Sequence, residues 1–343
     1  MPQSAPYDAT LIPGDGIGPE VVAAAVDVLE ATGVAFNWDE QQAGMGAFED
    51  GGDPLPQATI DSIERTRLAF KGPLTTPVGT GFRSINVRIR QHFDLYANVR
   101  PCETLPNTHG AFQGIDLMLY RENTEGLYAG IEYFDERNQI ADSINRITRK
   151  GSERIIRYAF EDVIRRGRER LTIVHKANIL KESGGMFLGI GREIAEEHPE
   201  VQFDDRIIDN MAMQLVIRPE TFDSIVTTNM FGDILSDLMA GLVGGLGVTG
   251  SANIGDDCAV FEAVHGSAPD IAGQGIANPT AIIRSGVMML RYLGEVEAAE
   301  AVRASLHDLY SDASNLTSDL GGSSSTADFG SALADRVRAR LAA

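Results

Sequence analysis

The chain of 343 residues has few cysteines and few lysines, and both shortages exclude something. Only Cys102 and Cys258 occur, so no disulfide framework holds the chain, and we expect a reducing compartment. Four lysines are present, and 49 acidic residues outnumber 29 basic residues to give a net charge of −20. This charge argues against a general affinity for nucleic acid or for anionic membranes.

Long hydrophobic runs are also missing. No apolar run approaches the ~20 residues that a membrane span needs. The first residues lack the basic and apolar blocks of a signal peptide, so we expect a soluble, cytoplasmic protein. The sequence has no P-loop, no zinc-type Cys/His cluster and no nucleophile elbow. Its length indicates roughly two domains, each large enough for a hydrophobic core.

Apolar runs that are typical of strands alternate with helical patterns, which predicts an α/β fold. We expect strands near residues 9–12, 171–175 and 222–227. Hydrophobic residues at helical spacing predict helices over residues 21–31, 151–166, 280–293 and 296–310. No long linker separates two domains, so we expect the second domain to be inserted into the first.

A glycine run follows the first strand. Gly14, Gly16 and Gly18 have the spacing G-x-G-x-G, whereas the dinucleotide-binding fingerprint is G-x-G-x-x-G. Pro19 also occupies the position where that fingerprint has its close-packed first turn. The run therefore predicts a tight turn, with Pro19 and Glu20 opening a helix.

Asp233 and Asp237 follow the strand at 222–227 and are four residues apart. On a helix they would share one face, one turn above the other. Two carboxylates that close repel each other unless a proton or a cation lies between them. A divalent metal with oxygen ligands is one explanation. The alternative is that Asp233 favours a helix N-terminus and Asp237 lies on a solvated face.

Arginines are concentrated between residues 80 and 100 of this acidic chain. They are Arg83, Arg88, Arg90 and Arg100, and Arg121 follows. Guanidinium groups bind carboxylates bidentately, so the cluster suits a small polycarboxylate, although an arginine-rich helix is often only a solvated face. Ser84 is placed to cap the helix that begins there, and a capping hydroxyl can also donate to an anion.

Three further side chains have both a structural and a chemical explanation. Lys176 ends a buried strand, where it either loses affinity for its proton and acts as a base or extends to the surface. Tyr128 fits a half-buried core residue with a satisfied hydroxyl. His265 lies in a loop rich in glycine and proline that would allow close approach to a nucleotide.

Taken together, these segments resemble the metal-dependent β-decarboxylating dehydrogenases, the isocitrate and 3-isopropylmalate dehydrogenase family. The matching blocks are Ile12-Pro-Gly-Asp-Gly-Ile-Gly-Pro-Glu, Arg121-Glu-Asn-Thr-Glu-Gly, Val174-His-Lys-Ala-Asn, Asn229-Met-Phe-Gly-Asp-Ile-Leu-Ser-Asp and Glu262-Ala-Val-His-Gly-Ser-Ala-Pro-Asp-Ile-Ala-Gly. They run in family order from residue 11 to about residue 325. The resemblance implies an α/β fold that is not a classical Rossmann fold. Residues 1–98 and 248–343 would form the large cofactor-binding domain, and residues 99–247 an inserted small domain with an arm and the dimer interface.

The resemblance also assigns roles to residues. The substrate-binding residues would be Ser84, Asn86, Arg90, Arg100, Arg121 and Asn178. Lys176 would accept the proton of the substrate hydroxyl, and Tyr128 would protonate C3 after CO₂ leaves. Asp209, Asp233 and Asp237 would bind Mg²⁺ or Mn²⁺, with Lys176 and Asp209 coming from the second subunit of a homodimer that shares its active sites and that could pair into a tetramer.

The segment Ser84-Ile-Asn86 distinguishes members of this family by their substrate. It resembles isocitrate dehydrogenases, in which serine and asparagine bind the distal carboxylate, whereas isopropylmalate enzymes have an apolar leucine there. An alkyl group would leave the polar side chains of Ser84 and Asn86 unpaired, which is costly. We therefore expect oxidative decarboxylation of isocitrate to 2-oxoglutarate. A homoisocitrate or other 2-hydroxy-diacid dehydrogenase is one alternative, and a non-catalytic regulatory subunit is another.

The loop after His265 indicates the cofactor. NADP-dependent relatives have a lysine–tyrosine pair where this chain has Asp270 and Ile271. A carboxylate accepts from the ribose hydroxyls of NAD and repels a 2′-phosphate, so NAD is expected. The cofactor-binding residues implied by the resemblance are Thr76, His265, Gly266, Ala268, Asp270, Ile271 and Asn278.

Overall fold

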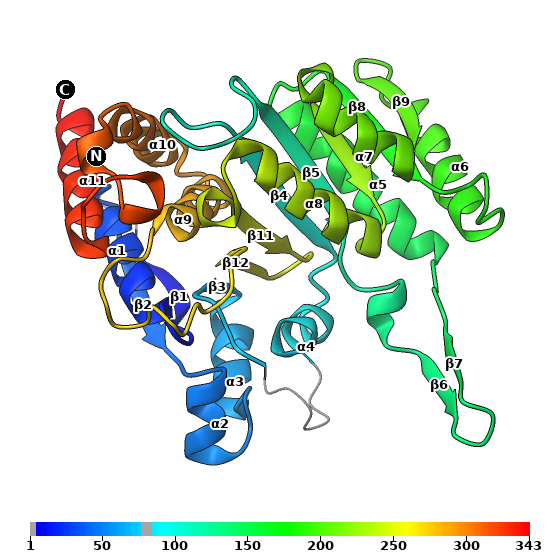
Figure 1. Cartoon of the computed structure of the whole chain (residues 1–343), viewed down its shortest axis with the longest axis horizontal. Helices are drawn as coiled ribbons and strands as arrows, with labels where there is room; N and C mark the ends of the chain where they lie inside the picture. Colours follow the sequence, from blue (N-terminus) through cyan, green and yellow to red (C-terminus); the bar gives the residue numbers. More distant parts are fainter. Residues whose placement is uncertain (1–4, 77–83) are drawn as a thin grey trace.

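The computed structural model describes residues 5–76 and 84–343, whose strands form one large sheet and a separate hairpin (Figure 1). Arg83 of the arginine cluster lies outside the described residues. The ten strands of the large sheet are, in order across it, β2 (Phe36–Glu40), β1 (Tyr7–Ile12), β3 (Leu68–Lys71), β12 (Ala259–Ala263), β11 (Gly250–Ile254), β4 (Ala97–Glu103), β5 (Asp116–Glu122), β10 (Ser224–Thr227), β8 (Arg170–His175) and β9 (Gln202–Ile207).

The sheet consists of two parallel halves joined by antiparallel strands. β2, β1, β3 and β12 are parallel to one another, as are β5, β10, β8 and β9. At the centre, β11 is antiparallel to both β12 and β4, and β4 is antiparallel to β5. The two parallel halves therefore run in opposite directions, and their strand ends face opposite edges of the sheet.

Eleven α-helices surround the sheet in the described part of the chain. They are α1 (Gly18–Glu30), α2 (Met45–Gly51), α3 (Gln57–Thr66), α4 (Ile85–His92), α5 (Arg149–Arg165), α6 (Ser183–Ala195), α7 (Ile208–Ile217), α8 (Asn229–Val243), α9 (Thr280–Tyr292), α10 (Val296–Tyr310) and α11 (Thr326–Leu341). Short 3-10 helices are η1 (Leu127–Ala129), η2 (Pro219–Thr221), η3 (Leu246–Val248), η4 (Ala313–Asn315) and η5 (Ser318–Leu320). None of the helices in the described part is long and apolar enough to cross a membrane.

The helices bury both faces of the sheet. α5 and α6 pack together against one part of it, and α7 and α8 pack together against neighbouring strands of the same half. β10 is buried at every position, as a strand covered on both faces must be. In the other half, α1 packs against α9 and α11, so that the two ends of the chain meet (Figure 1). The hairpin of β6 (Glu132–Asp135) and β7 (Ile140–Ser143) projects away from the body as an arm (Figure 1).

Most predicted elements are present with small shifts at their ends. The helix predicted over residues 151–166 is α5, and the helix predicted over 296–310 has the predicted bounds. The strand predicted from residue 222 begins only at Ser224, because Pro219–Thr221 form a 3-10 turn that Phe222 completes. The α/β fold class is confirmed.

The glycine run forms the predicted tight turn. Gly14 and Gly16 have φ of +83° and +60°, a region that favours glycine. A Cβ atom on Gly16 would also lie 2.0 Å from the backbone oxygen of Ser267. α1 then begins at Gly18, with Pro19 in its first turn. The turn therefore brings the first strand against the loop that contains His265.

The predicted domain boundaries remain a prediction. The boundary between residues 98 and 99 falls inside β4, and the boundary between 247 and 248 falls inside η3. Because β4 and β11 are hydrogen-bonded neighbours, the sheet continues across both boundaries without a break.

Candidate active site

The candidate active-site residues gather at one edge of the sheet. β5, β10 and β8 are parallel neighbours, so their carboxyl ends meet at the same edge. Arg121 is the sixth residue of the seven-residue strand β5, α8 begins directly after β10, and Lys176 follows β8. The strand order thus brings together segments that are about 50 residues or more apart in the sequence.

Asp233 is the centre of this arrangement. One of its oxygens accepts from the guanidinium of Arg121 and the other from the hydroxyl of Tyr128. Asn229, one turn earlier on α8, fixes Arg121 by accepting from its Nε at 3.0 Å and from a terminal nitrogen at 2.8 Å. Asp237 lies one turn after Asp233 on the same helix, as predicted, and its side chain is 58% exposed.

A chain of buried polar contacts connects Arg100 with Arg90. Arg100 donates from Nε to Asn98 at 2.8 Å, and Asn98 donates to Asn253 at 3.0 Å. Asn253 donates to Glu262 at 2.8 Å, and the same Glu262 oxygen lies 3.2 Å from a terminal nitrogen of Arg90. These contacts cross from β4 through β11 to β12 and α4, so the sheet itself sets the spacing of the two arginines.

Lys71 completes this network. Its ammonium lies 2.7 Å from Glu262, and only 2% of its side chain is exposed. Burial would raise the pKa of Glu262, but Lys71 and Arg90 hold it far below the ordinary glutamate value. Five residues of this network were not predicted as site residues from the sequence: Lys71, Asn98, Asn229, Asn253 and Glu262. The available signal was a polar residue inside an otherwise apolar strand, as in Leu68–Lys71 and Ala259–Ala263.

The arginines of the site repel one another. Burial, followed by the charges of Arg121 and Arg90, lowers the pKa of Arg100 to about 10. Burial, followed by the charge of Arg90, also lowers the pKa of Arg121. Burial would raise the pKa of Asp233, yet Arg121, Tyr128 and Arg100 lower it below its ordinary value. A cluster of this kind is stabilised by bound carboxylates.

Helix α4 presents unpaired polar atoms beside this cluster. Ser84 is at the N-cap position as predicted, but its hydroxyl makes no capping hydrogen bond and the residue is exposed. Asn86 and Arg90 lie four residues apart on one face, and the buried atoms Asn86 Oδ1 and Arg90 Nε have no partner among the described residues. Gln91 of the same helix donates at 3.5 Å to the carbonyl of Tyr128. α4 therefore offers free polar groups next to Tyr128.

Lys176, Asp209 and Asn178 are not part of this cluster within one chain. Lys176 forms an ion pair with Asp209 of α7, which lowers the pKa of Asp209 chiefly through this hydrogen bond. No hydrogen bond or ion pair in the described part of the chain joins either residue to Asp233 or Asp237. Asn178 is exposed in the turn after β8.

The carboxylates fit a divalent cation only in part. Asp233 and Asp237 supply hard oxygen ligands one helical turn apart, which suits Mg²⁺ or Mn²⁺. The described residues contain no group of three or more metal-ligating side chains close enough to hold an ion alone. One chain therefore provides two candidate ligands, Asp233 and Asp237, and the remaining ligands have to come from a substrate or from another chain.

The loop between β12 and α9 contains the predicted cofactor residues. His265 Nδ1 is 2.9 Å from the carbonyl of Gly266, which can only accept, so Nδ1 carries the proton. His265 Nε2 is then a buried acceptor without a partner, and burial lowers the pKa of the ring. Ala268 has φ of +37°, Asp270 is exposed, and Ile271 packs against the core. A neutral acceptor at His265 fits the amino group of an adenine.

The two remaining predicted cofactor residues, Thr76 and Asn278, make side-chain hydrogen bonds within the chain. Thr76 lies at the N-terminal side of α4, and its hydroxyl is 3.4 Å from the amide of Ile85. Asn278 is buried and already satisfied, because it donates to Asp319 at 3.1 Å and accepts from the amide of Thr280 at 3.0 Å. A direct contact of the Asn278 side chain with a cofactor would require one of these bonds to break.

Comparisons with known proteins agree with the fold. The profile of the isocitrate/isopropylmalate dehydrogenase family matches residues 8–333. A crystal structure of isocitrate dehydrogenase from Methylococcus capsulatus superposes with a TM-score of 0.93 at 57% identity, covering 97% of this chain and 99% of that chain.

Three curated relatives are similar over most of the chain. A mitochondrial NAD isocitrate dehydrogenase catalytic subunit 5 from Arabidopsis thaliana is 46% identical, over 97% of this chain and 89% of the relative. An isocitrate/homoisocitrate dehydrogenase from Thermus thermophilus is 50% identical, over 97% and 99%. An NADP isocitrate dehydrogenase from the same species is 48% identical, over 91% of this chain and 64% of the relative.

The match over residues 8–333 identifies the class of protein as a dehydrogenase of the isocitrate/isopropylmalate type. The chain belongs to the isocitrate/isopropylmalate dehydrogenase family, as its sequence motifs predicted.

Proposed function

We propose that this protein is a metal-dependent NAD isocitrate dehydrogenase that converts isocitrate to 2-oxoglutarate and CO₂. The observation that carries the proposal is the convergence of Arg100, Arg121 and Tyr128 on Asp233, with Asp237 one turn away. These groups supply carboxylate binding, a proton donor and metal ligands within one site.

The residues of the chain bind and orient the substrate. Arg100 and Arg121 hold the two carboxylates next to the reacting carbons, and Asn98 and Asn229 hold the guanidinium planes in position. Arg90 is anchored through Glu262, and its buried Nε has no hydrogen-bond partner among the described residues. Fixed charges in a partly buried site need no rearrangement when negative charge develops during the reaction.

Protons move at two places in the proposed reaction. Lys176 of a second copy takes the proton of the substrate hydroxyl, and a bound nicotinamide cofactor would supply the hydride acceptor. A divalent cation held by Asp233 and Asp237 would polarise the C2 oxygen and so favour loss of CO₂. Tyr128 then gives its proton to C3. Its pKa is raised by burial and then by Asp233, so Tyr128 is protonated at neutral pH.

The first alternative to isocitrate is a longer acid, homoisocitrate. The hydroxyl of Ser84 and the amide nitrogen of Asn86 can donate to a distal carboxylate, whereas an alkyl group would leave both donors unused. The relative from Thermus thermophilus named for both isocitrate and homoisocitrate keeps the longer acid as a second candidate. Isocitrate is proposed because both polar side chains lie at the start of α4, in the segment that resembles isocitrate dehydrogenases.

NAD rather than NADP is proposed on the charge at the end of the cofactor loop. The carboxylate of Asp270 is exposed and accepts from no described donor, so it is free to accept from ribose hydroxyls. It would repel a 2′-phosphate. The relative named as an NADP enzyme makes this the part of the proposal that most needs a direct assay.

A homodimer that shares its active sites is also proposed. α7 exposes Met213, Val216 and Ile217, and α8 exposes Ile234, with Ile217 63% exposed. The arm exposes Tyr133, Phe134 and Ile140. Exposed apolar surfaces of this kind indicate a protein interface. A second copy on this face would place its own Asp209 and Lys176, which belong to the same region, near Asp233.

The decisive experiment is an assay of the purified chain with Mn²⁺. NADH formation and release of 2-oxoglutarate are expected with isocitrate and NAD, and exhaustive EDTA treatment should abolish turnover. A higher kcat/KM for homoisocitrate, or for NADP, would replace the corresponding part of the proposal. No activity of the isolated chain with any of these substrates would favour a non-catalytic subunit.

A further inference from the structure

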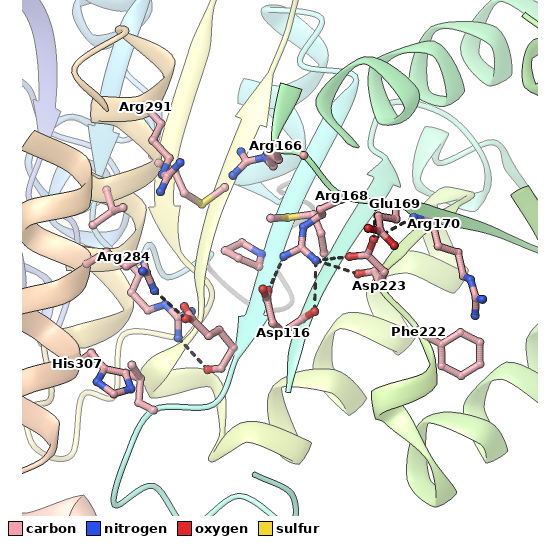
Figure 2. A pocket seen from close by; sticks show the side chains of 18 of the residues that line it. Asp116, Arg166, Arg168, Glu169, Arg170, Phe222, Asp223, Arg284, Arg291 and His307 are labelled. Atoms are coloured by element: carbon pink, nitrogen blue, oxygen red, sulfur yellow. Dashed lines mark hydrogen bonds and ion pairs between the residues drawn. The ribbon is translucent and has the colours of Figure 1, made fainter. Parts of the chain in front are cut away.

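A second cavity lies at the opposite edge of the sheet from the candidate active site. Its volume is about 790 Å³, and it opens where β5, β8 and β10 begin, at Asp116, Arg170 and Asp223 (Figure 2). α9 and α10 form its other wall. The active-site residues lie where the same strands end. Five residue steps from Asp116 to Arg121 separate the two edges by roughly 17 Å.

The lining combines an apolar floor with arginines. Met118, Met288 and Leu306 are buried at the floor. The arginines that line the cavity are Arg166, Arg168, Arg170, Arg284, Arg291 and Arg303. Six carboxylates also line the cavity, those of Glu103, Asp116, Glu169, Glu220, Asp223 and Glu300, so the arginines available to a ligand are those whose nitrogens these carboxylates leave unpaired. The volume lies within the ~300–1,000 Å³ that is common for small-molecule sites.

Some of these arginines serve the fold and are not available to a ligand. Arg168 is held by Asp116 and Asp223, and these ion pairs are drawn in Figure 2. Arg284 pairs with Glu103 at 3.0 Å. These ion pairs hold Arg168 and Arg284 in fixed positions in the cavity wall.

Other guanidinium nitrogens are free. Arg166 uses only its Nε, on Asp162, and its terminal nitrogens have no partner among the described residues. Arg170 donates only to neutral oxygens, those of Thr221 and Gln202 at 2.9 and 3.2 Å. Its positive charge is therefore not balanced by a carboxylate within the described part of the chain.

Arg166 and Arg291 reach into the same part of the cavity from opposite walls (Figure 2). Arg166 directly follows α5, whereas Arg291 is in the last turn of α9. Arg291 makes one ion pair, through a terminal nitrogen to Glu300 at 2.9 Å, which leaves its other nitrogens free. Two guanidinium groups with free, planar donors favour an anion with several oxygen atoms.

We propose that this cavity is a second ligand site, which binds a small polyanion carrying phosphate or carboxylate groups. The anionic groups lie between Arg166 and Arg291, and the uncharged part of the ligand packs on Met118 and Met288. The site is separate from the proposed isocitrate site and does not depend on that proposal. Because its walls come from both halves of the sheet, an occupied cavity links the two halves.

Calorimetric titration of the purified full-length chain in metal-free, low-salt buffer tests this site. The probes are inorganic pyrophosphate, ADP and 1,2,3-propanetricarboxylate. Arg291→Ala removes one of the two guanidinium groups and breaks only a partly buried ion pair with Glu300, and Arg166→Ala removes the second guanidinium group. Arg157→Ala is the matched control, because Arg157 lies on α5, pairs with the exposed Glu197 and is outside the cavity. Thermal melts check that each variant is folded.

At least one probe should bind the wild type, and each cavity variant should weaken that binding by about tenfold or more, as expected for a lost charge-assisted hydrogen bond. The control should bind like the wild type.

Tighter binding of ADP than of pyrophosphate would identify a nucleoside phosphate as the ligand class, and preference for the tricarboxylate would identify a polycarboxylate. Absence of binding at millimolar concentration, or equal binding by the wild type and Arg291→Ala, would overturn the proposal. Arg291→Ala decides the matter if Arg166→Ala fails to fold, since Arg166 also holds the buried Asp162.

Discussion

Tyr128 donates its hydroxyl to Asp233, and burial followed by this contact raises the pKa of the tyrosine. A phenol that stays protonated is a suitable acid for the last proton transfer. We predict that Tyr128→Phe lowers kcat by about 100-fold or more, since general acid catalysis contributes about 10²–10⁴. Steady-state kinetics with isocitrate would measure this. Tyr292→Phe, at an exposed position at the end of α9, is the control, and an unchanged kcat for Tyr128→Phe would exclude the role.

Glu262 offers a test of the buried network through its pH dependence. Its pKa is lowered in the folded protein, so its ion pairs stabilise the fold at pH values above the ordinary glutamate pKa of about 4.3. That stability is lost as the pH falls further, towards the folded-state pKa. We predict that Glu262→Gln lowers the free energy of unfolding by about 3 kcal/mol at pH 7, the cost of breaking a buried pair.

Urea denaturation at fixed protein concentration would measure this difference. The gap between the wild type and Glu262→Gln should shrink as the pH falls below about 4.3, where the wild-type carboxylate begins to lose its advantage. Glu64→Gln, an exposed glutamate beside His92, should show a small difference. A gap that is equally large at low pH would mean that the charge of Glu262 is not what stabilises the fold.

At the scale of elements, the loop between β12 and α9 determines the proposed cofactor preference. Replacing Asp270 and Ile271 by lysine and tyrosine (Asp270→Lys, Ile271→Tyr) removes a repelling charge and adds an attracting one. We predict that the ratio of kcat/KM for NADP to that for NAD rises by at least about tenfold, because like-charge contacts cost several kcal/mol. Asp257→Lys, in the exposed turn between β11 and β12, controls for net charge. An unchanged ratio would place the 2′ position of the ribose elsewhere.

Elements with a regular pattern were predictable from the sequence, and pairings between distant strands were not. α5 and α10 have hydrophobic residues at helical spacing, and the Asp233–Asp237 pair follows from that spacing alone. The contact of Lys71 with Glu262 depends on β3 and β12 being neighbours, although about 190 residues separate them. Nothing in the local pattern of either strand sets that order. The arginine cluster was found because its members are close in sequence.

No contact in the described part of the chain brings Lys176 and Tyr128 together. If both residues act in one site, a single chain therefore cannot form a complete active site. In the proposed dimer each site takes Tyr128 from one copy and Lys176 from the other. We predict that Tyr128→Phe and Lys176→Met chains are each inactive and that mixed dimers regain one intact site. Random mixing should then restore about a quarter of the wild-type activity, by the symmetry of the dimer.

Co-expression of the two variants with different affinity tags allows the mixed dimer to be isolated and assayed. A mixed dimer without activity would show that both residues act within the same chain. Dilution series in the ultracentrifuge provide the control for dimer formation. Ile217→Glu on the exposed face of α7 should shift the same chain towards the monomer.

In the described part of the chain, the two halves of the sheet are joined by hydrogen-bonded strands that run from β2 to β9 without a gap. One half can rotate relative to the other only if the twist between neighbouring strands changes, most simply around the antiparallel pair β4 and β11. The side chains of Asn98 and Asn253 join these same two strands. A rotation of one half against the other would therefore deform the polar contacts that hold Arg100 and Arg90, so that movement between the halves and the capacity to bind a carboxylate are mechanically coupled.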